Sequence, residues 1–232
     1  MEIVQSDTES MLIISCNDEA KSYLANIPDE YQEVEYIQSS WSQYINTNFA
    51  YSQPTWQIKV KYLSTQFWSQ YHTYRLWWSY NSSSPTSRSF ILYVNYSKLR
   101  LGLWTGDSDS WISLSTNTIY ELEETITTAW TVNIKLTPNW WNTVTATKTY
   151  SWTIATNNNF YIFANNETGS PWSYGRNRLY YLQLYQAWEL VRDFVPCYRK
   201  SDNVIWLYDK VNGVFYTNQW SWSFTKWPDY KR

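Results

Sequence analysis

The stretch of residues 131–147, TVNIKLTPNWWNTVTAT, decides the fold class of this chain. Apolar and polar residues alternate before its centre, in residues 131–136, and again after it, in residues 143–147. Such alternation is typical of a half-buried β-strand, because successive side chains of a strand point to opposite faces. Pro138 and the asparagines beside it mark a turn. The stretch therefore predicts two strands joined by a turn, with a tryptophan pair where a turn normally has glycine.

The same alternation recurs along the chain from Tyr31 onward. It is found in residues 34–37, 57–62 and 179–185, where Thr, Val, Ile and Tyr dominate. These residue types suit a pleated, half-buried surface. The connecting stretches are rich in Ser, Asn, Thr and Pro, and the pattern of a long helix is missing there. We therefore predict an all-β sandwich or jelly roll.

Residues 1–27 are predicted to form an N-terminal extension, with a short helix that starts at Asp18 and ends before Pro28. The apolar run of residues 11–14 follows acidic residues rather than lysines, so it is not a typical secretory signal. We expect that export of this protein would use a signal outside this sequence, or that the chain is a fragment of a longer product.

Tryptophan holds the share of the composition that glycine usually has. The 232 residues include 17 Trp and only 5 Gly, whereas glycine makes up roughly 7% of an average domain. Many of the tryptophans lie between predicted strands, where a bulky aromatic residue resists the positive φ that glycine adopts freely. These positions include Trp41, Trp77, Trp78, Trp140, Trp141, Trp172, Trp188, Trp220, Trp222 and Trp227.

A reassigned codon explains the exchange of glycine for tryptophan. The codon UGA is read as glycine in some bacterial lineages and as tryptophan in others. If a gene from a lineage that reads UGA as glycine is translated with a code that reads UGA as tryptophan, the resulting sequence shows Trp at Gly sites. We hypothesise that most of the 17 tryptophans are glycine in the cell. We then expect exposed turns, several with positive φ, at Trp41, Trp140, Trp141, Trp188, Trp220 and Trp222. The alternative is a Trp-rich sugar binder, but these residues are spread over nearly every connection.

Charge and the rare residue types exclude several classes of function. The net charge is −2 and 16% of the residues are charged, which excludes the basic surface of a nucleic-acid binder. No apolar run approaches the roughly 20 residues that a membrane helix needs, so we expect no membrane insertion. A lone histidine, His72, excludes a His-based zinc site. Cys16 and Cys197 are predicted to be unpaired thiols, with Cys197 buried.

Both ends of the predicted domain resemble a known family. Residues 28–47, PDEYQEVEYIQSSWSQYINT, and residues 190–216, LVRDFVPCYRKSDNVIWLYDKVNGVFY, are similar to the ends of a bacterial laminin-G-like domain of the concanavalin A-like lectin/glucanase superfamily. The similarity is strong at both ends and loose in the middle. The family pattern has glycine where this sequence has Trp41, Trp188, Trp206, Trp220, Trp222 and Trp227, which supports the codon hypothesis.

The resemblance implies a concanavalin A-like jelly-roll β-sandwich over residues 28–232. Family members occur in surface proteins of host-associated bacteria and in phage-related proteins, with carbohydrate as the suspected ligand and no known reaction. The resemblance therefore implies a non-catalytic recognition or adhesion module that is extracellular, at a cell surface or on a phage particle, and that binds a glycan or a surface protein. The alternatives are a structural display domain and a glycoside hydrolase of the same fold.

Two pairs of glutamates have the spacing that glycosidases of this fold use. Glu121 and Glu123, like Glu33 and Glu35, are two residues apart, so both side chains of a pair face one side of a strand. Neither pair is followed by a further carboxylate two residues on. We interpret both as solvated strand faces. Arg192 and Asp193 are expected to supply a structural inter-strand ion pair.

The sequence also contains one weak candidate for a metal site. With glycine at position 111, Asp107 and Asp109 form Asp-x-Asp-x-Gly, a truncated relative of oxygen-rich calcium loops, and laminin-G-like folds often hold calcium at the sandwich rim. A third carboxylate is missing nearby in the sequence, so a turn without metal is the competing interpretation. We expect no other cofactor, and the sequence names no side chain that contacts a ligand.

Overall fold

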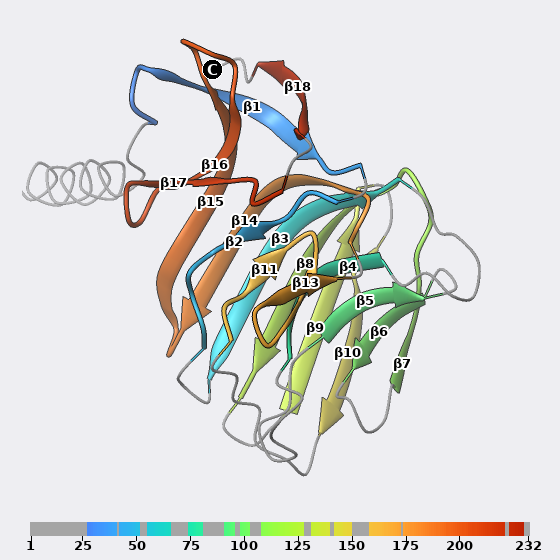
Figure 1. Ribbon diagram of the computed structural model, residues 1–232. Helices are drawn as coiled ribbons and strands as arrows, with labels where there is room; N and C mark the ends of the chain where they lie inside the picture. The colour runs from blue at the N-terminus through green and yellow to red at the C-terminus, as the bar shows by residue number, and fades with distance from the viewer. Residues whose placement is uncertain are drawn as a thin grey trace, which may run out of the picture.

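Two β-sheets pack face to face in the computed structural model (Figure 1). Every regular element in the part of the chain that the structure describes is a β-strand, which confirms the predicted all-β sandwich. No helix in that part is long and apolar enough to cross a membrane. The described residues are 27–40, 42–51, 55–65, 74–80, 91–95, 98–102, 108–127, 131–139, 142–149, 158–172, 174–220 and 223–229.

The first sheet has ten strands within the described residues. Its order is β10 (Val144–Thr149), β9 (Thr131–Pro138), β8 (Ile119–Ile126), β3 (Trp56–Ser64), β14 (Asn177–Gln186), β1 (Tyr31–Gln38), β15 (Glu189–Arg199), β16 (Ile205–Asp209) and β17 (Val214–Thr217). The tenth strand, β18 (Thr225–Asp229), pairs with β1. We call this the large sheet.

The second sheet covers one face of the large sheet (Figure 1). Its described strands follow the order β13 (Ser170–Trp172), β12 (Asn165–Glu167), β4 (Tyr74–Tyr80), β5 (Ile91–Asn95), β6 (Lys98–Gly102) and β7 (Ser108–Ser113). The short strand β11 (Tyr161–Ile162) pairs with β4 and with β2 (Ile45–Asn46).

The alternation read from the sequence separates the core from the outer face of the large sheet. In β3 the side chains of Trp56, Ile58 and Val60 are buried between the sheets, while Lys59 and Lys61 lie on the other face. The hairpin predicted from residues 131–147 is also present, because β9 and β10 pair from Val144 opposite Leu136 to Thr149 opposite Thr131. Alternating strands therefore give the large sheet one apolar face and one largely polar outer face.

Strand β1 enters the large sheet as a wedge between β14 and β15. These two strands pair directly where Leu182–Gln186 run beside Glu189–Phe194. Farther along, β1 lies between them: Glu33 is opposite Cys197 of β15, and Gln38 is opposite Arg178 of β14. The wedge spreads β14 and β15 apart, and this irregularity positions the candidate site.

A small second core packs on the outer face beside β15 and β16. It is formed by Ile27, Val195, Cys197 and Tyr208, with Tyr31 and Phe215 stacked at a ring-centroid distance of 3.5 Å. Cys197 is buried, as predicted, and burial is the main cause that raises the pKa of its thiol to about 12. Such a thiol is protonated at neutral pH, which agrees with a packing role. Cys16, His72 and the predicted helix after Asp18 lie outside the described residues.

Candidate functional site

The structure leaves the predicted calcium site untested. Asp107 lies outside the described residues, and Asp109 belongs to β7. The segment from Ser108 is a strand rather than the expected turn, because it pairs with β6, with Asp109 opposite Arg100 and Ser108 opposite Leu101. Within the described part of the chain, no group of three or more His, Cys, Asp or Glu side chains could hold a metal ion. Calcium binding at Asp107 and Asp109 stays a prediction.

Glu121 and Glu123 lie on the outer face of β8, two residues apart as the sequence indicates. Each has a partner on the neighbouring strand β3. Lys61 Nζ lies 3.7 Å from Glu121 Oε1, and Gln57 Nε2 donates a hydrogen bond of 2.8 Å to Glu123 Oε1. These contacts are those of a solvated sheet face, in agreement with our interpretation of the pair.

The next residue, Glu124, faces the opposite way and was missed by sequence reasoning. Its side chain is fully buried between the sheets, opposite Ile58 of β3 and Ile134 of β9. Neither carboxylate oxygen has a hydrogen-bond partner among the described residues. Burial raises the pKa of Glu124 well above its ordinary value, so this carboxyl group is a buried polar residue of the core.

Where β1 spreads β14 and β15, the outer face of the large sheet is hollowed. The hollow has a volume of about 570 Å³, which lies within the usual range for small-molecule sites. We call it the sheet hollow. It is lined by Glu33, Val34, Glu35, Lys61, Tyr180, Tyr181, Gln183, Asp193, Val195 and Lys210. The site therefore combines aromatic rings, carboxylates, an amide and two lysines on a rigid sheet.

Asp193 is the most buried charged group of the sheet hollow. Only 5% of the residue is exposed. Gln183 Nε2 donates a hydrogen bond of 3.2 Å to its Oδ1, and Gln183 Oε1 accepts one of 3.1 Å from the Tyr185 hydroxyl. Burial raises the pKa of Asp193, although Gln183 and the charge of Lys210 oppose the shift. The amide of Gln183 thus orients both a carboxylate and a tyrosine at the edge of the hollow.

Tyrosine rings form the wall of the sheet hollow on the β14 side. Tyr180 is half-buried; its ring lies 5.2 Å from that of Tyr36, and Lys61 Nζ lies 5.7 Å from its centroid. Tyr181 is also half-buried, and burial is the main cause that raises its pKa to about 12. Both hydroxyls therefore stay protonated at neutral pH and can donate hydrogen bonds.

Tyr181 also lines a smaller depression of about 90 Å³ on the same face. Its other lining residues are Lys59, Glu121, Leu122, Glu123, Lys135 and Thr137. The two depressions share one tyrosine, so a polar and aromatic strip crosses the large sheet from β1 to β9. Such a strip is long enough in the strand-to-strand direction for an extended ligand, since neighbouring strands lie about 4.8 Å apart.

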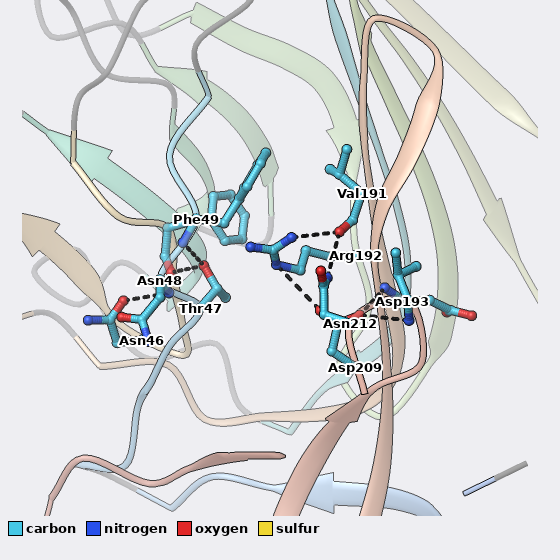
Figure 2. Close-up of polar contacts among 11 residues, drawn as sticks. Asn46, Thr47, Asn48, Phe49, Val191, Arg192, Asp193, Asp209 and Asn212 are labelled. Atoms are coloured by element: carbon cyan, nitrogen blue, oxygen red, sulfur yellow. Dashed lines mark hydrogen bonds and ion pairs between the residues drawn. The ribbon is translucent and has the colours of Figure 1, made fainter. Parts of the chain in front are cut away.

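Arg192, the neighbour of Asp193 on β15, contacts two other segments of the chain. Figure 2 shows its side chain between the segment Asn46–Phe49 and the turn that contains Asp209 and Asn212. Its Nε lies 3.4 Å from Asp209 Oδ2, and its guanidinium carbon lies 5.0 Å from the centroid of the Phe49 ring. The inter-strand ion pair expected here is therefore formed by Arg192 with Asp209 on β16, while Asp193 lines the sheet hollow.

Asp209 is a buried hub for the strands that carry the site. It is fully buried, and its Oδ1 accepts hydrogen bonds from the backbone N–H groups of Asp193 (3.0 Å) and Val211 (3.1 Å). Asn212 Nδ2 donates a bond of 2.6 Å to Asp209 Oδ2. By fixing the backbone at Asp193, Asp209 also fixes where the carboxylate of Asp193 enters the sheet hollow.

The tryptophans of the described residues do not all have the same environment. Trp188 lies in the two-residue turn between β14 and β15, with a φ of 71° and 59% of the residue exposed, and Ala187 before it has a φ of 49°. Trp220 lies in an exposed bend. Trp56, by contrast, is buried in β3 and stacks on Tyr51 at a centroid distance of 4.4 Å.

Our turn prediction holds for Trp188 and Trp220 and fails for some other tryptophans. Trp77, Trp78, Trp172 and Trp227 belong to strands, with Trp227 exposed in β18, whereas Trp206, at which we predicted no turn, lies in β16. Trp41, Trp140, Trp141 and Trp222 lie outside the described residues. Position 188 is therefore the one predicted turn, among the described residues, at which a tryptophan has a positive φ.

Comparisons with known proteins support the fold and leave the family open. The sequence matches no protein-family model and no curated protein. A protein from Bacteroides ovatus whose name proposes carbohydrate binding is similar in structure, with a TM-score of 0.53 and 11% identity over 84% of this chain and 60% of that one. This similarity, together with the two packed sheets, confirms the predicted jelly-roll sandwich.

Two further solved structures are less similar. The CBM40 of a Ruminococcus gnavus sialidase, bound to α2,3-sialyllactose, gives a TM-score of 0.48 at 13% identity over 67% of this chain and 90% of that one. Scytalido-glutamic peptidase gives 0.40 at 10% identity over 67% and 84%. A fold by itself does not establish a function, so function must be argued from the site.

Proposed function

We propose that this chain is a non-catalytic carbohydrate-recognition module that binds its ligand in the sheet hollow. The observation that carries the proposal is the lining of that hollow, in which Tyr180 and Tyr181 stand beside Gln183, Asp193 and two lysines. Sugar rings present apolar C–H faces that suit aromatic rings. Their hydroxyl groups donate to carboxylates and accept from amides and ammonium groups. The name of the Bacteroides ovatus protein supports the same class of ligand.

The proposed site is independent of whether the turn positions carry tryptophan or glycine in the cell. Among the described residues, no tryptophan lines the sheet hollow or the smaller depression beside it. Sugar binding through Tyr180 and Tyr181 is therefore expected whether the protein carries tryptophan or glycine at the turn positions.

A glycan array followed by titration of the ligands that bind tests this proposal. Tyr181→Ala should weaken binding about tenfold, since it removes an aromatic wall shared by both depressions. Tyr174→Ala, which changes a half-buried tyrosine that lines neither depression, is the matched control. A blank array from folded protein would favour the alternative of a structural display module.

We propose that the module does not hydrolyse its ligand. Glu121 and Glu123 are each held by a partner on β3, Lys61 and Gln57, and this supports a role in the polar surface. A hydrolysis assay with Glu121→Gln and Glu123→Gln tests the alternative of a glycoside hydrolase. Hydrolysis by the unchanged protein that both variants abolish would replace the recognition proposal with an enzymatic one.

We further propose that residues 28–232 form a laminin-G-like domain of a bacterial surface or phage-associated protein, following an extension at residues 1–27. In this proposal several turn tryptophans are glycine in the cell. The support is the backbone at Trp188, whose φ of 71° is one that glycine adopts freely. Sequencing the gene tests it: UGA at position 188 agrees, and UGG there would refute it. We expect UGG at Trp56, which fills the core.

A further inference from the structure

The charges that line the sheet hollow are unbalanced. Three carboxylates, those of Glu33, Glu35 and Asp193, line it together with two ammonium groups, those of Lys61 and Lys210. Lys61 is shared with a carboxylate outside the hollow, since its Nζ lies 3.7 Å from Glu121 Oε1. Among the described lining residues the carboxylates therefore outnumber the ammonium groups by one, although the charge of Lys210 acts on Asp193.

The most buried of these carboxylates is also the most firmly positioned. Asp193 is 5% exposed, its Oδ1 accepts the hydrogen bond from Gln183, and its backbone N–H is held by Asp209. No described residue donates a hydrogen bond to its other oxygen, Oδ2. A buried carboxylate in a hollow interacts more strongly with a ligand cation than an exposed one, because less water screens the attraction.

The aromatic wall favours a cation as well. The face of a tyrosine ring carries partial negative charge and attracts an ammonium group within about 6 Å. Tyr180, which lines the hollow, already has such a contact with Lys61 Nζ at 5.7 Å, and Tyr36, which lies outside the lining, has one with the Arg178 guanidinium at 4.6 Å. Rings and carboxylates thus meet in the same place, which is the combination that recognises an ammonium group attached to an apolar body.

We propose that the sheet hollow is selective for glycans that carry a free, protonated amino group, as in a deacetylated amino sugar. The ammonium group would lie against Asp193 and Glu35, and the sugar ring against Tyr180 and Tyr181. This inference rests on the proposed carbohydrate recognition and names the chemical class of its ligand. N-acetylation removes the charge and adds bulk, so it should weaken binding.

Calorimetric titration with a β1,4-linked glucosamine tetramer and its fully N-acetylated counterpart tests the inference. At about pH 6, where a free amine is protonated, the glucosamine tetramer should bind about tenfold more tightly than the acetylated one. Glu35→Gln and Asp193→Asn should each remove most of this preference while the protein stays folded by circular dichroism. Glu189→Gln, an exposed change outside the hollow, should leave it intact.

The outcomes separate the inference from the proposal on which it rests. Equal or tighter binding of the acetylated tetramer, lost in Tyr181→Ala, would overturn the amine selectivity and leave carbohydrate recognition in place. A preference for the amine that survives both Glu35→Gln and Asp193→Asn would also overturn it, because the selecting charge would then lie elsewhere. Failure of folded protein to bind either tetramer overturns the inference, and the glycan array then decides the proposed function by itself.

Discussion

At the scale of the residue, Trp188 and Trp56 are opposite cases of one residue type. Trp188 is exposed with a positive φ, whereas Trp56 is buried in a regular strand. A bulky residue in the left-handed region has an unfavourable conformational energy, because its Cβ crowds the backbone, and glycine avoids this strain. The same side chain in a core excludes water and contacts many neighbours. Identical residues should therefore respond oppositely to the same substitution.

We predict that Trp188→Gly stabilises the protein by about 1 kcal/mol, because relief of strain exceeds the entropy that glycine loses on folding. Trp56→Gly should destabilise it by at least about 3 kcal/mol, since it leaves a large cavity. Urea unfolding monitored by far-UV circular dichroism measures both. A loss of stability in Trp188→Gly would contradict the strain argument and weaken the codon proposal with it.

Glu124 and Asp193 show what sequence reasoning misses at this scale. Glu124 stands between Glu123 and Thr125 in a run of three charged or polar residues, yet its place in the alternation of β8 puts it in the core. Asp193 looks like the partner of a neighbouring arginine, yet it lines the hollow while Arg192 contacts Asp209. Period-two alternation assigns faces correctly, but it does not reveal which polar residue on a face is buried.

At the scale of the element, the turn between β16 and β17 depends on one carboxylate. Asp209 accepts two backbone N–H groups and the amide of Asn212, and it lies beside Arg192. Asp209→Ala should lower the free energy of unfolding by about 3–5 kcal/mol, because it leaves a half-buried arginine and two backbone donors without their acceptor.

Thermal unfolding measures the effect of Asp209→Ala. Asp202→Ala is the matched control, since Asp202 pairs with Arg199 at the surface, where an ion pair contributes little. Equal losses in the two variants would show that the buried contacts of Asp209 add nothing beyond a surface ion pair.

Strand β10 should be less protected than the central strands of the large sheet. Most of its residues are exposed, and β9 is its one partner among the described strands of the sheet. In the neighbouring strands toward the centre of the sheet, β9 and β8, buried residues alternate with exposed or half-buried ones. Because local opening is easiest where few side chains are buried, amide hydrogens of Val144–Thr149 should exchange faster than those of Trp56–Ser64. Equal protection of β10 and β3 in hydrogen exchange would contradict this view.

The elements were more predictable than the site. Residues 131–147 already indicated a hairpin, and the alternation in residues 57–62 and 179–185 correctly assigned the two central strands of the large sheet. The sheet hollow could not be predicted in this way. It results from β1 lying between β14 and β15, and pairings between residues more than a hundred positions apart leave no periodic signal in the sequence.

At the scale of the whole molecule, two buried carboxyl groups set the pH dependence of stability. Burial raises the pKa of Glu124 and of Asp193 above their ordinary values of 4.5 and 3.8. The folded protein therefore binds protons more tightly at these groups than the unfolded chain does. The free energy of unfolding should fall as the pH rises above about 4 and stop falling once both groups are ionised in the folded protein.

Thermal unfolding between about pH 5 and pH 8 measures this slope, in which each kcal/mol corresponds to about 2–4 °C for a chain of this size. The midpoint should be higher at the acidic end. The double variant Glu124→Gln, Asp193→Asn should flatten the slope, and the exposed change Glu189→Gln should not. A midpoint that rises with pH in the unchanged protein would show that other groups outweigh these two.

Strand β1 also makes the large sheet depend on strands that are synthesised much later. Tyr36 of β1 lies opposite Trp227 of β18, and Glu33 lies opposite Cys197. A ribosome that adds roughly 5–20 residues per second needs roughly 10–40 s to make the chain between Tyr36 and Trp227. Until then Val34 and Ile37 of β1 lack some of the strands that flank them in the folded protein. The hollow formed by β1, β14 and β15 is thus among the last features to assemble, and a nascent chain lacks the proposed ligand site until its late strands emerge.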